Sequence, residues 1–288
     1  MITYNKKDIP EHLQKYFEPA ELGLEPTFQE YIIKLCDIFD EVKRVLKKEG
    51  TCFVNLGDTY SGNKVGKTDK KCSDYVKGSQ DNLIKRATIQ EKTLCLIPFR
   101  FAIEMVNRGW ILRNTIIWWK PKCMPSSVKD RFTVDFEYLF FFVKNKRYWF
   151  KPQREPLQES SLSRAKYGSY SSKTDKGIHG GMNLKNQLKA FEKINNGELR
   201  GRNKRCVWRI PTRSFKGSHF AVFPETLVET PIKAGCPKDG VILDPFAGAG
   251  TVGVVCKKNN YNFIGIDLNP KYVEMGQKRI NNTQESMF

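Results

Sequence analysis

The sequence predicts an α/β protein with a doubly wound, mostly parallel sheet that is interrupted by one basic insertion. Three observations predict this class. Apolar runs of strand length alternate with helical periodicities near the carboxyl end, a glycine-rich turn follows one of these runs, and the regular pattern is lost over residues 151–205. A chain of 288 residues is long enough for about two domains, or for one large domain with an insertion.

The first half of the chain contains two helical patterns and three strand patterns. Apolar residues spaced three and four apart predict an amphipathic helix over residues 28–47, and a second helix is expected over 91–107. Short runs that are apolar or rich in β-branched and aromatic residues predict strands at 52–56, 111–119 and 137–143.

The last quarter of the chain alternates regularly between helix and strand. The expected elements are a helix at 224–234, a strand at 241–244, a helix from 249, a strand at 263–267 and a helix at 270–281. This alternation predicts parallel strands. We therefore assign residues 1–150 and 206–288 to one domain and 151–205 to an insertion, with only a weak helix near 184–194.

The charge of the chain is large and localised. There are 49 Lys and Arg residues against 31 Asp and Glu, which gives a formal net charge of +18. The segment from Lys144 to Lys216 has 19 basic and 5 acidic residues, so it holds +14 of that total, and tyrosine and tryptophan are interspersed with its cations. This pattern favours nucleic acid as the partner, although a solvated linker can have the same composition.

Several protein classes are excluded or disfavoured. No apolar run approaches the roughly 18 to 20 residues that a membrane span needs, so no membrane association is expected. The polar start MITYNKKDIPEH lacks the features of a secretory signal, which favours the cytoplasm. The eight cysteines stand singly, without C-x-x-C spacing, so we expect reduced thiols and no metal.

The segment VILDPFAGAGTVGVV, from Val241 to Val255, has the pattern of a ligand-binding turn. An apolar strand ends at Asp244, and the glycines that follow allow the backbone to approach a ligand at the carboxyl end of the strand. Asp267 ends the next strand, where a carboxylate can accept hydrogen bonds from both hydroxyls of a ribose. The alternative is that Asp267 caps the helix that begins near Pro270. An adenosine cofactor is therefore expected.

The segments DPFAGAGTVG and GIDLNPKYVEMGQKRI resemble the S-adenosylmethionine-binding half of the DNA amino-methyltransferases, which methylate adenine N6 or cytosine N4. Three further segments, beginning at LGLEPTFQEY, IIWWKPKCMP and RIPTRSFKGS, resemble successive blocks of that family. The catalytic blocks precede the cofactor block, as in the family's β-type order. The resemblance covers the chain except for about 151–204, and it implies a Rossmann-like fold with target recognition by the basic insertion.

The resemblance also implies roles for individual residues. S-adenosylmethionine would be bound by the glycine turn, the next strand tip and the SHFAVFP block, at His219, Phe220, Asp244, Phe246, Gly248, Gly250, Thr251 and Asp267. The residues expected at the target base are Tyr4, Asn55 and Asp58. The cations expected to contact DNA are Lys166, Arg200, Arg202, Lys204 and Arg205. A structural role is the alternative for a lone histidine such as His219.

One departure from the family pattern concerns catalysis. The family carries an Asp/Asn/Ser-Pro-Pro-Tyr/Phe tetrapeptide ahead of the GLEPT block, and these 288 residues contain no Pro-Pro dipeptide. In the family, this tetrapeptide holds the exocyclic amine of a flipped base and stacks on its ring. Tyr4, which follows an Ile-Thr lead-in, is either the remaining aromatic residue or an accidental match. A catalytically impaired homologue is therefore an alternative to an active enzyme.

The expected activity is methyl transfer from S-adenosylmethionine to an exocyclic amine of double-stranded DNA. The Thr3 lead-in slightly favours cytosine N4 over adenine N6, which stays as the alternative. A cognate restriction endonuclease is the expected protein partner. Methylation of RNA or of a protein side chain is a competing hypothesis, against which the lysine-rich insertion and the NLGDTY segment both argue.

Overall fold

The computed structural model of the chain describes residues 22–23, 25, 27–61, 89–156, 196, 201–212 and 223–284. It divides into two compact units. The first unit comprises Met1–Phe150 together with Cys206–Phe288, and the second comprises Lys151–Arg205. Within the described part of the chain, no helix is both long enough and apolar enough to cross a bilayer.

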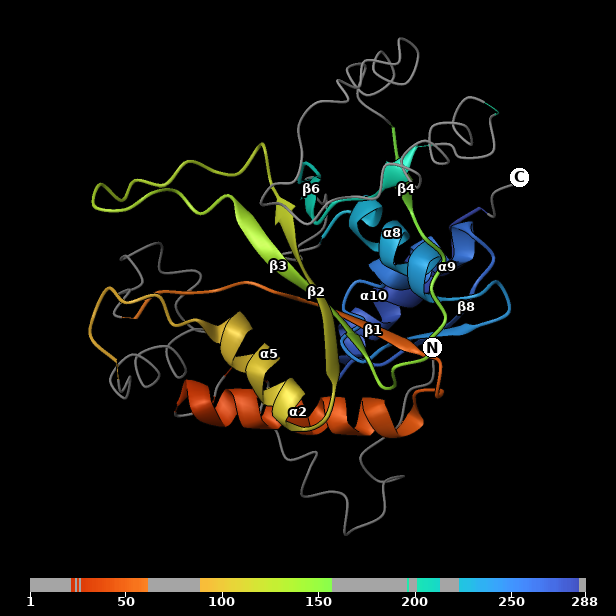
Figure 1. Cartoon of the computed structure of the whole chain (residues 1–288), viewed down its shortest axis with the longest axis horizontal. Helices are drawn as coiled ribbons and strands as arrows, with labels where there is room; N and C mark the ends of the chain where they lie inside the picture. The colour runs from red at the N-terminus through yellow and green to blue at the C-terminus, as the bar shows by residue number, and fades with distance from the viewer. Residues whose placement is uncertain are drawn as a thin grey trace, which may run out of the picture. The chain divides into compact units, whose positions relative to one another are not determined.

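The first unit contains a four-stranded sheet of mixed direction (Figure 1). Its strands lie in the order β1, β3, β2 and β6, with bounds Thr51–Leu56, Phe136–Val143, Ile111–Trp119 and Val207–Arg209. Strand β3 is antiparallel to both β1 and β2, and β6 is parallel to β2. The apolar and aromatic runs that predicted β1, β2 and β3 therefore form adjacent strands, and β6 had no strand pattern long enough to be predicted.

Two helices cover one face of this sheet, where they lie side by side in Figure 1. Helix α2, Phe28–Val45, begins after Thr27, whose hydroxyl accepts a hydrogen bond from the backbone N–H of Glu30 at 3.2 Å. Helix α5, Ile97–Asn107, begins six residues later than the sequence predicted. Lys92 and Leu96 have φ values of +65° and +58°, which a right-handed helix cannot contain, so the helix starts only after Leu96.

The largest apolar cluster lies between these helices and the sheet. It combines residues of α2 and α5 with the inward-facing residues of β1 and β3, and its most deeply buried members include Cys36, Phe101, Met105, Phe140 and Phe142. Alternate residues of β3 belong to the cluster on the opposite face, among them Leu139 and Phe141. Strand β3 is therefore buried on both faces, which explains its continuous apolar sequence.

Helix α8, Glu225–Gly235, packs against the opposite face of the sheet. The hydroxyl of Thr51 in β1 donates a hydrogen bond to the carbonyl oxygen of Gly235 at 2.9 Å. A Cβ atom at Gly235 would lie 2.2 Å from that hydroxyl oxygen. The end of α8 and the start of β1 are thus held in direct contact, which ties the first sheet to the elements that follow α8.

The last elements form a second, parallel pair of strands with their helices. Strand β7, Val241–Asp244, pairs in parallel with β8, Asn262–Gly265. Helix α9, Thr251–Lys258, connects them, and α10, Pro270–Asn281, follows β8. The regular alternation predicted for this part of the sequence is confirmed, with element bounds within two residues of the prediction.

The α/β class is confirmed, but the sheet differs from the expected mostly parallel one. Among the described strands of the first unit, β1 and β7 are not joined by a ladder, and β3 runs against both of its neighbours. The connection from β2 to β3 contains no helix, whereas a parallel pair needs a crossover connection. The direct return of the chain explains the antiparallel direction of β3.

The second unit contains a short antiparallel ladder between β4, Arg154–Glu155, and β5, Arg202–Asn203. Gly201 precedes β5 with a φ of +97°, and a Cβ atom there would lie 2.4 Å from the carbonyl oxygen of Glu155. The helix expected near 184–194 lies outside the described residues.

Candidate functional site

The tips of β7 and β8 are joined by backbone hydrogen bonds. The N–H of Ile266 donates to the carbonyl oxygen of Asp244 at 2.9 Å, and the N–H of Ala247 donates to that of Ile266 at 2.8 Å. The carboxylate of Asp244 accepts a hydrogen bond from the N–H of Phe246 at 3.0 Å. These contacts turn the chain sharply after Asp244 and place the glycine-rich turn beside the end of β8.

The carboxylate of Asp267 connects the two strand tips. Its Oδ2 accepts a hydrogen bond from the N–H of Gly248 at 2.8 Å, and its Oδ1 accepts one from the N–H of Asn269 at 2.8 Å. Helix α10 is capped by Asn269, whose side chain accepts from the N–H of Lys271 at 3.0 Å. The helix-capping role considered for Asp267 therefore belongs to Asn269. Each oxygen of Asp267 retains capacity for a further hydrogen bond.

Glycine is required in the turn between β7 and α9. Gly248 and Gly250 have φ values of +48° and +74°, in the left-handed region that favours glycine. A Cβ atom at Gly250 would lie 2.9 Å from the Cα atom of Gly276 in α10. The following helix begins at the buried Thr251, so its N-terminal amides point towards the turn.

The helix that follows the turn contains a third glycine, whose role is packing. Gly253 completes a G-x-G-x-x-G spacing with Gly248 and Gly250. It lies inside α9, where a Cβ atom would come within 2.7 Å of the ring of Phe263 in β8. The absence of a side chain at Gly253 thus allows α9 to pack closely on β8, in the manner of a nucleotide-binding strand–turn–helix.

The electrostatics of the site are dominated by two neighbouring carboxylates. The pKa of Asp244 is raised to about 6, mainly by burial and to a smaller extent by the negative charge of Asp267, against the lowering effect of the hydrogen bond from the N–H of Phe246. A group that titrates this close to neutrality is common at binding and catalytic sites. A positively charged ligand beside Asp244 would stabilise its ionised form.

A second group of polar side chains lies at the carboxyl end of β1. The side-chain amide of Asn55 donates a hydrogen bond from Nδ2 to the carbonyl oxygen of Tyr138 at 3.0 Å. Asp58 accepts at Oδ1 from the N–H groups of Thr59, at 2.9 Å, and of Ile97, at 3.1 Å. Its Oδ2 is buried and has no hydrogen-bond partner among the described residues. Asp58 therefore caps helix α5 while keeping one oxygen unsatisfied.

One aromatic contact joins the glycine turn between β7 and α9 to the rest of the first unit. The ring of Phe246, which is 46% exposed, lies 6.4 Å from the ring of Phe39 in α2, centroid to centroid. Phe39 belongs to the core between α2 and the four-stranded sheet. Phe246 thus presents part of its ring to solvent from a position that is fixed by packing.

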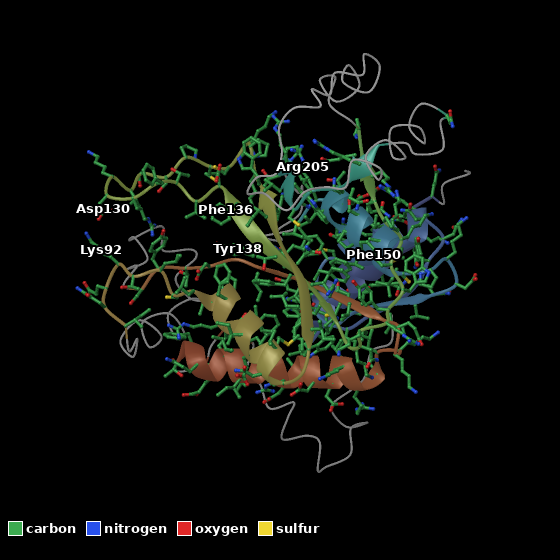
Figure 2. The ribbon with its side chains drawn as sticks, viewed as in Figure 1. Lys92, Asp130, Phe136, Tyr138, Phe150 and Arg205 are labelled. Carbon is green, nitrogen blue, oxygen red and sulfur yellow. The ribbon has the colours of Figure 1, made fainter. Side chains whose placement is uncertain are left out.

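The predicted DNA-contacting arginines form an ion-pair network within the second unit. Arg202 and Arg205 donate from Nε to the same oxygen of Glu155, at 2.8 Å and 2.6 Å. The backbone N–H of Lys204 donates to the carbonyl oxygen of Gln153 at 2.9 Å. Burial raises the pKa of Glu155, but hydrogen bonds from Arg205 and Arg202 outweigh this effect and leave the pKa below its ordinary value. Figure 2 labels Arg205.

The remaining predicted site residues belong to other segments of the chain. Five of them lie outside the described residues: Tyr4, Lys166, Arg200, His219 and Phe220. Among the residues that the structure does describe, no group of three or more His, Cys, Asp or Glu side chains could hold a metal ion.

Sequence reasoning missed two residues that shape these sites. Gly276 lies where a Cβ atom would come within 3.3 Å of the backbone of the glycine turn, and an isolated glycine inside a predicted helix was the available signal. Glu155 holds two arginines of the basic segment, and nothing in the local sequence indicated this pairing.

With this geometry in place, comparison with known proteins identifies the family. A family model described as DNA methylase, for N6 and N4 methyltransferases, matches residues 4–278. The chain belongs to this DNA methylase family. The resemblance stated from the sequence is therefore confirmed, and the methylase is an S-adenosylmethionine-dependent DNA amino-methyltransferase.

Curated relatives cover nearly the whole methylase. It is 34% identical over 272 residues to the Type II methyltransferase M.SmaI of Serratia marcescens, and the alignment covers 93% of this chain and 80% of M.SmaI. It is also 34% identical over 271 residues to the Type II methyltransferase M.Cfr9I of Citrobacter freundii, and that alignment covers 93% of this chain and 77% of M.Cfr9I.

A solved structure supports the Rossmann-like fold of the methylase. The PvuII DNA methyltransferase, described as cytosine-N4-specific, superposes with a TM-score of 0.57 at 17% identity, over 89% of this chain and 73% of that one. At this level of identity the likeness concerns the fold.

Proposed function

We propose that the methylase binds S-adenosylmethionine in the turn between β7 and α9, with Asp267 accepting hydrogen bonds from the ribose hydroxyls. The observation that carries this proposal is the 2.8 Å hydrogen bond from the N–H of Gly248 to Asp267, which holds the acidic tip of β8 against the glycine turn of β7. Because each carboxylate oxygen can accept more than one hydrogen bond, the backbone contacts leave room for a diol.

The other residues of the turn would surround the rest of the cofactor. Asp244 would face its positively charged methionine part, since a nearby cation favours the ionised form of a carboxyl whose pKa is raised by burial. The exposed ring of Phe246 and the backbone of the turn would contact the adenosine. The remaining members of this proposed set are Gly248, Gly250, Thr251, His219 and Phe220.

We propose that the polar side chains at the carboxyl end of β1, Asn55 and Asp58, position the target amine. When bound, the cofactor supplies an electrophilic methyl group on a positively charged sulfur. The residues at the end of β1 would align the exocyclic nitrogen of a flipped base with that methyl group, and the proton that the nitrogen loses would pass to solvent. Asn55 Oδ1 is an acceptor that would orient an N–H bond of the amine. Asp58, whose Oδ2 is buried, would support this group by holding the start of α5 through the N–H of Ile97. Tyr4 would stack on the base.

The second unit is proposed to recognise DNA. Its basic sequence supports this role, and Arg202 and Arg205, which both pair with Glu155, would exchange that carboxylate for phosphates on binding DNA. Lys166, Arg200 and Lys204 complete the proposed contact set. We retain cytosine N4 as the preferred target, on the Ile-Thr lead-in, with adenine N6 as the alternative.

The biological setting follows from the relatives. M.SmaI and M.Cfr9I are Type II methyltransferases. A cognate restriction endonuclease is therefore the proposed partner, and the cytoplasm is the proposed location. Neither a metal nor a membrane is part of the proposed activity.

Expression in a host that lacks the modification, followed by modification-sensitive sequencing of its DNA, tests the proposed reaction. The expected result is one methylated sequence motif, with the methyl group on cytosine N4. Asp267→Ala should reduce this signal, and Asp239→Ala, which removes an exposed carboxylate just ahead of β7, is the matched control. Unmodified DNA from a chain that binds S-adenosylmethionine would instead favour the impaired homologue, which the absence of a Pro-Pro dipeptide supports.

A further inference from the structure

The connection between β2 and β3, residues 120–135, forms an arm that projects from the four-stranded sheet (Figure 1). The arm contains no helix or strand. Its most exposed apolar side chains are Phe132, at 96%, and Met124, at 88%. A phenylalanine this exposed gains nothing from the protein core, so its position calls for a partner outside it.

Specific contacts hold the arm on both sides of Phe132. Asp130 forms an ion pair with Lys92 at 2.7 Å, and the guanidinium of Arg131 lies 3.5 Å from the centroid of the Tyr60 ring. At the root, the indole N–H of Trp119 donates to the carboxylate of Asp135 at 2.8 Å. Figure 2 shows Lys92 and Asp130 at the outer end of the arm, and Phe136 at its root. These contacts fix the backbone around Phe132 and leave its ring outward.

The charge around Phe132 fits a polyanion. The arm carries Lys122, Lys129 and Arg131, and both of its carboxylates are engaged, Asp130 by Lys92 and Asp135 by Trp119. Cations that flank an apolar side chain are the composition that proteins use to insert a wedge between base pairs while contacting the adjacent phosphates.

We propose that the arm of residues 120–135 contacts the DNA duplex and inserts Phe132 between stacked bases. This proposal rests on the DNA methylase function. By unstacking the duplex next to the target, Phe132 would lower the cost of flipping the base out of the helix. Phe132 is then a positioning residue for methyl transfer, and it acts on duplex DNA rather than on the cofactor.

Single-turnover methyl transfer from labelled S-adenosylmethionine to plasmid DNA tests this role. Phe132→Ala should lose at least about 10-fold on the duplex and at most about 2-fold on the same plasmid after heat denaturation, because an unstacked substrate needs no wedge. Phe132→Leu should recover most of the rate. Ile103→Ala is the matched control, since Ile103 is 62% exposed on α5 and lies outside the arm.

Photocrosslinking tests the contact independently of catalysis. With p-benzoylphenylalanine at position 132, ultraviolet light should crosslink the methylase to labelled plasmid fragments, and the same group at position 103 should give at most a tenth of that yield. A duplex rate for Phe132→Ala within twofold of wild type, equal losses on duplex and denatured DNA, or equal crosslinking at the two positions would overturn the proposal. An inactive wild type would count against the methyltransferase activity, while the crosslinks would still decide whether the arm contacts DNA.

Discussion

The raised pKa of Asp244 predicts that cofactor affinity depends on pH. If Asp244 faces the positively charged end of S-adenosylmethionine, binding favours its ionised form. With a pKa of about 6, the carboxyl is about nine-tenths ionised at pH 7 and about one-tenth ionised at pH 5. Affinity for S-adenosylmethionine should therefore fall about 10-fold between pH 7 and pH 5, which corresponds to roughly 1.4 kcal/mol.

Isothermal titration calorimetry at several pH values measures this dependence. Repeating the titration at pH 6 in buffers of different ionisation enthalpy should reveal proton release on binding. Asp244→Asn is the control, because an amide does not titrate; its affinity should be low and flat from pH 5 to pH 7. The difference between the two curves isolates the contribution of Asp244.

Ionisation of Asp244 should favour cofactor binding, but it should lower the stability of the cofactor-free protein. The pKa of Asp244 in the folded protein lies above the ordinary value of 3.8, so the native state binds more protons than the unfolded state between about pH 4 and pH 6. Stability is therefore lost as the pH rises through this window. Asp244→Asn should raise the free energy of unfolding by roughly 1–3 kcal/mol at pH 8 and leave it nearly unchanged at pH 3. For the cofactor prediction, a wild-type affinity for S-adenosylmethionine that stays constant from pH 7 to pH 5 would refute the proposed contact between Asp244 and the cofactor.

Three further predictions concern other parts of the structure. Asp267→Ala should weaken S-adenosylmethionine binding by about 1–3 kcal/mol in calorimetry, through loss of the ribose acceptor and of the 2.8 Å contact with the glycine turn; unchanged affinity in a folded variant would contradict the ribose assignment. Glu155→Gln should release two arginines from their ion pairs and steepen the slope of log DNA affinity against log salt by about 1 to 2; an unchanged slope would show that these arginines do not meet phosphates. Gly250→Ala should destabilise the fold by about 1–3 kcal/mol in thermal unfolding, owing to its φ of +74° and the 2.9 Å approach to α10, whereas Gly57→Ala, where a Cβ atom has ordinary contacts, should be nearly neutral.

Local patterns predicted the elements better than they predicted the sheet. The strand expected at 111–119 and the final helix at 270–281 match the structure, since period and turn residues report directly on local conformation. Strand direction depends on how the chain returns, and the β2–β3 connection lacks the helix of a crossover. The sequence of this connection, KPKCMPSSVKD, contains proline and serine and does not favour a helix. The prediction of a parallel sheet rested on strand patterns alone and did not take this connection into account.

In the candidate site, too, local features could be predicted from the sequence and long-range contacts could not. Asp244 and Asp267 could be predicted because each ends a recognisable strand, and the structure joins their strand tips by hydrogen bonds. The contact of Asp58 with the start of α5 could not be predicted, because it links the N–H of Ile97 to a carboxylate 39 residues earlier. Long-range contacts of this kind leave no trace in the spacing of residues along the chain.

The short ladder of the second unit has a consequence for how new sequence specificities could arise. Glu155 pairs with Arg202 and Arg154 pairs with Asn203, so the chain enters and leaves residues 156–201 on neighbouring strands. The two ends of this segment are thus held together by a single ladder, so the segment can be exchanged as one piece. Doubling the number of residues between two paired strands adds only about 0.6 kcal/mol of closure free energy, so the segment between β4 and β5 could be lengthened, shortened or replaced while the ladder is kept. If the second unit recognises DNA as proposed, chimeras joined at this ladder should exchange the recognised sequence without rebuilding the first unit.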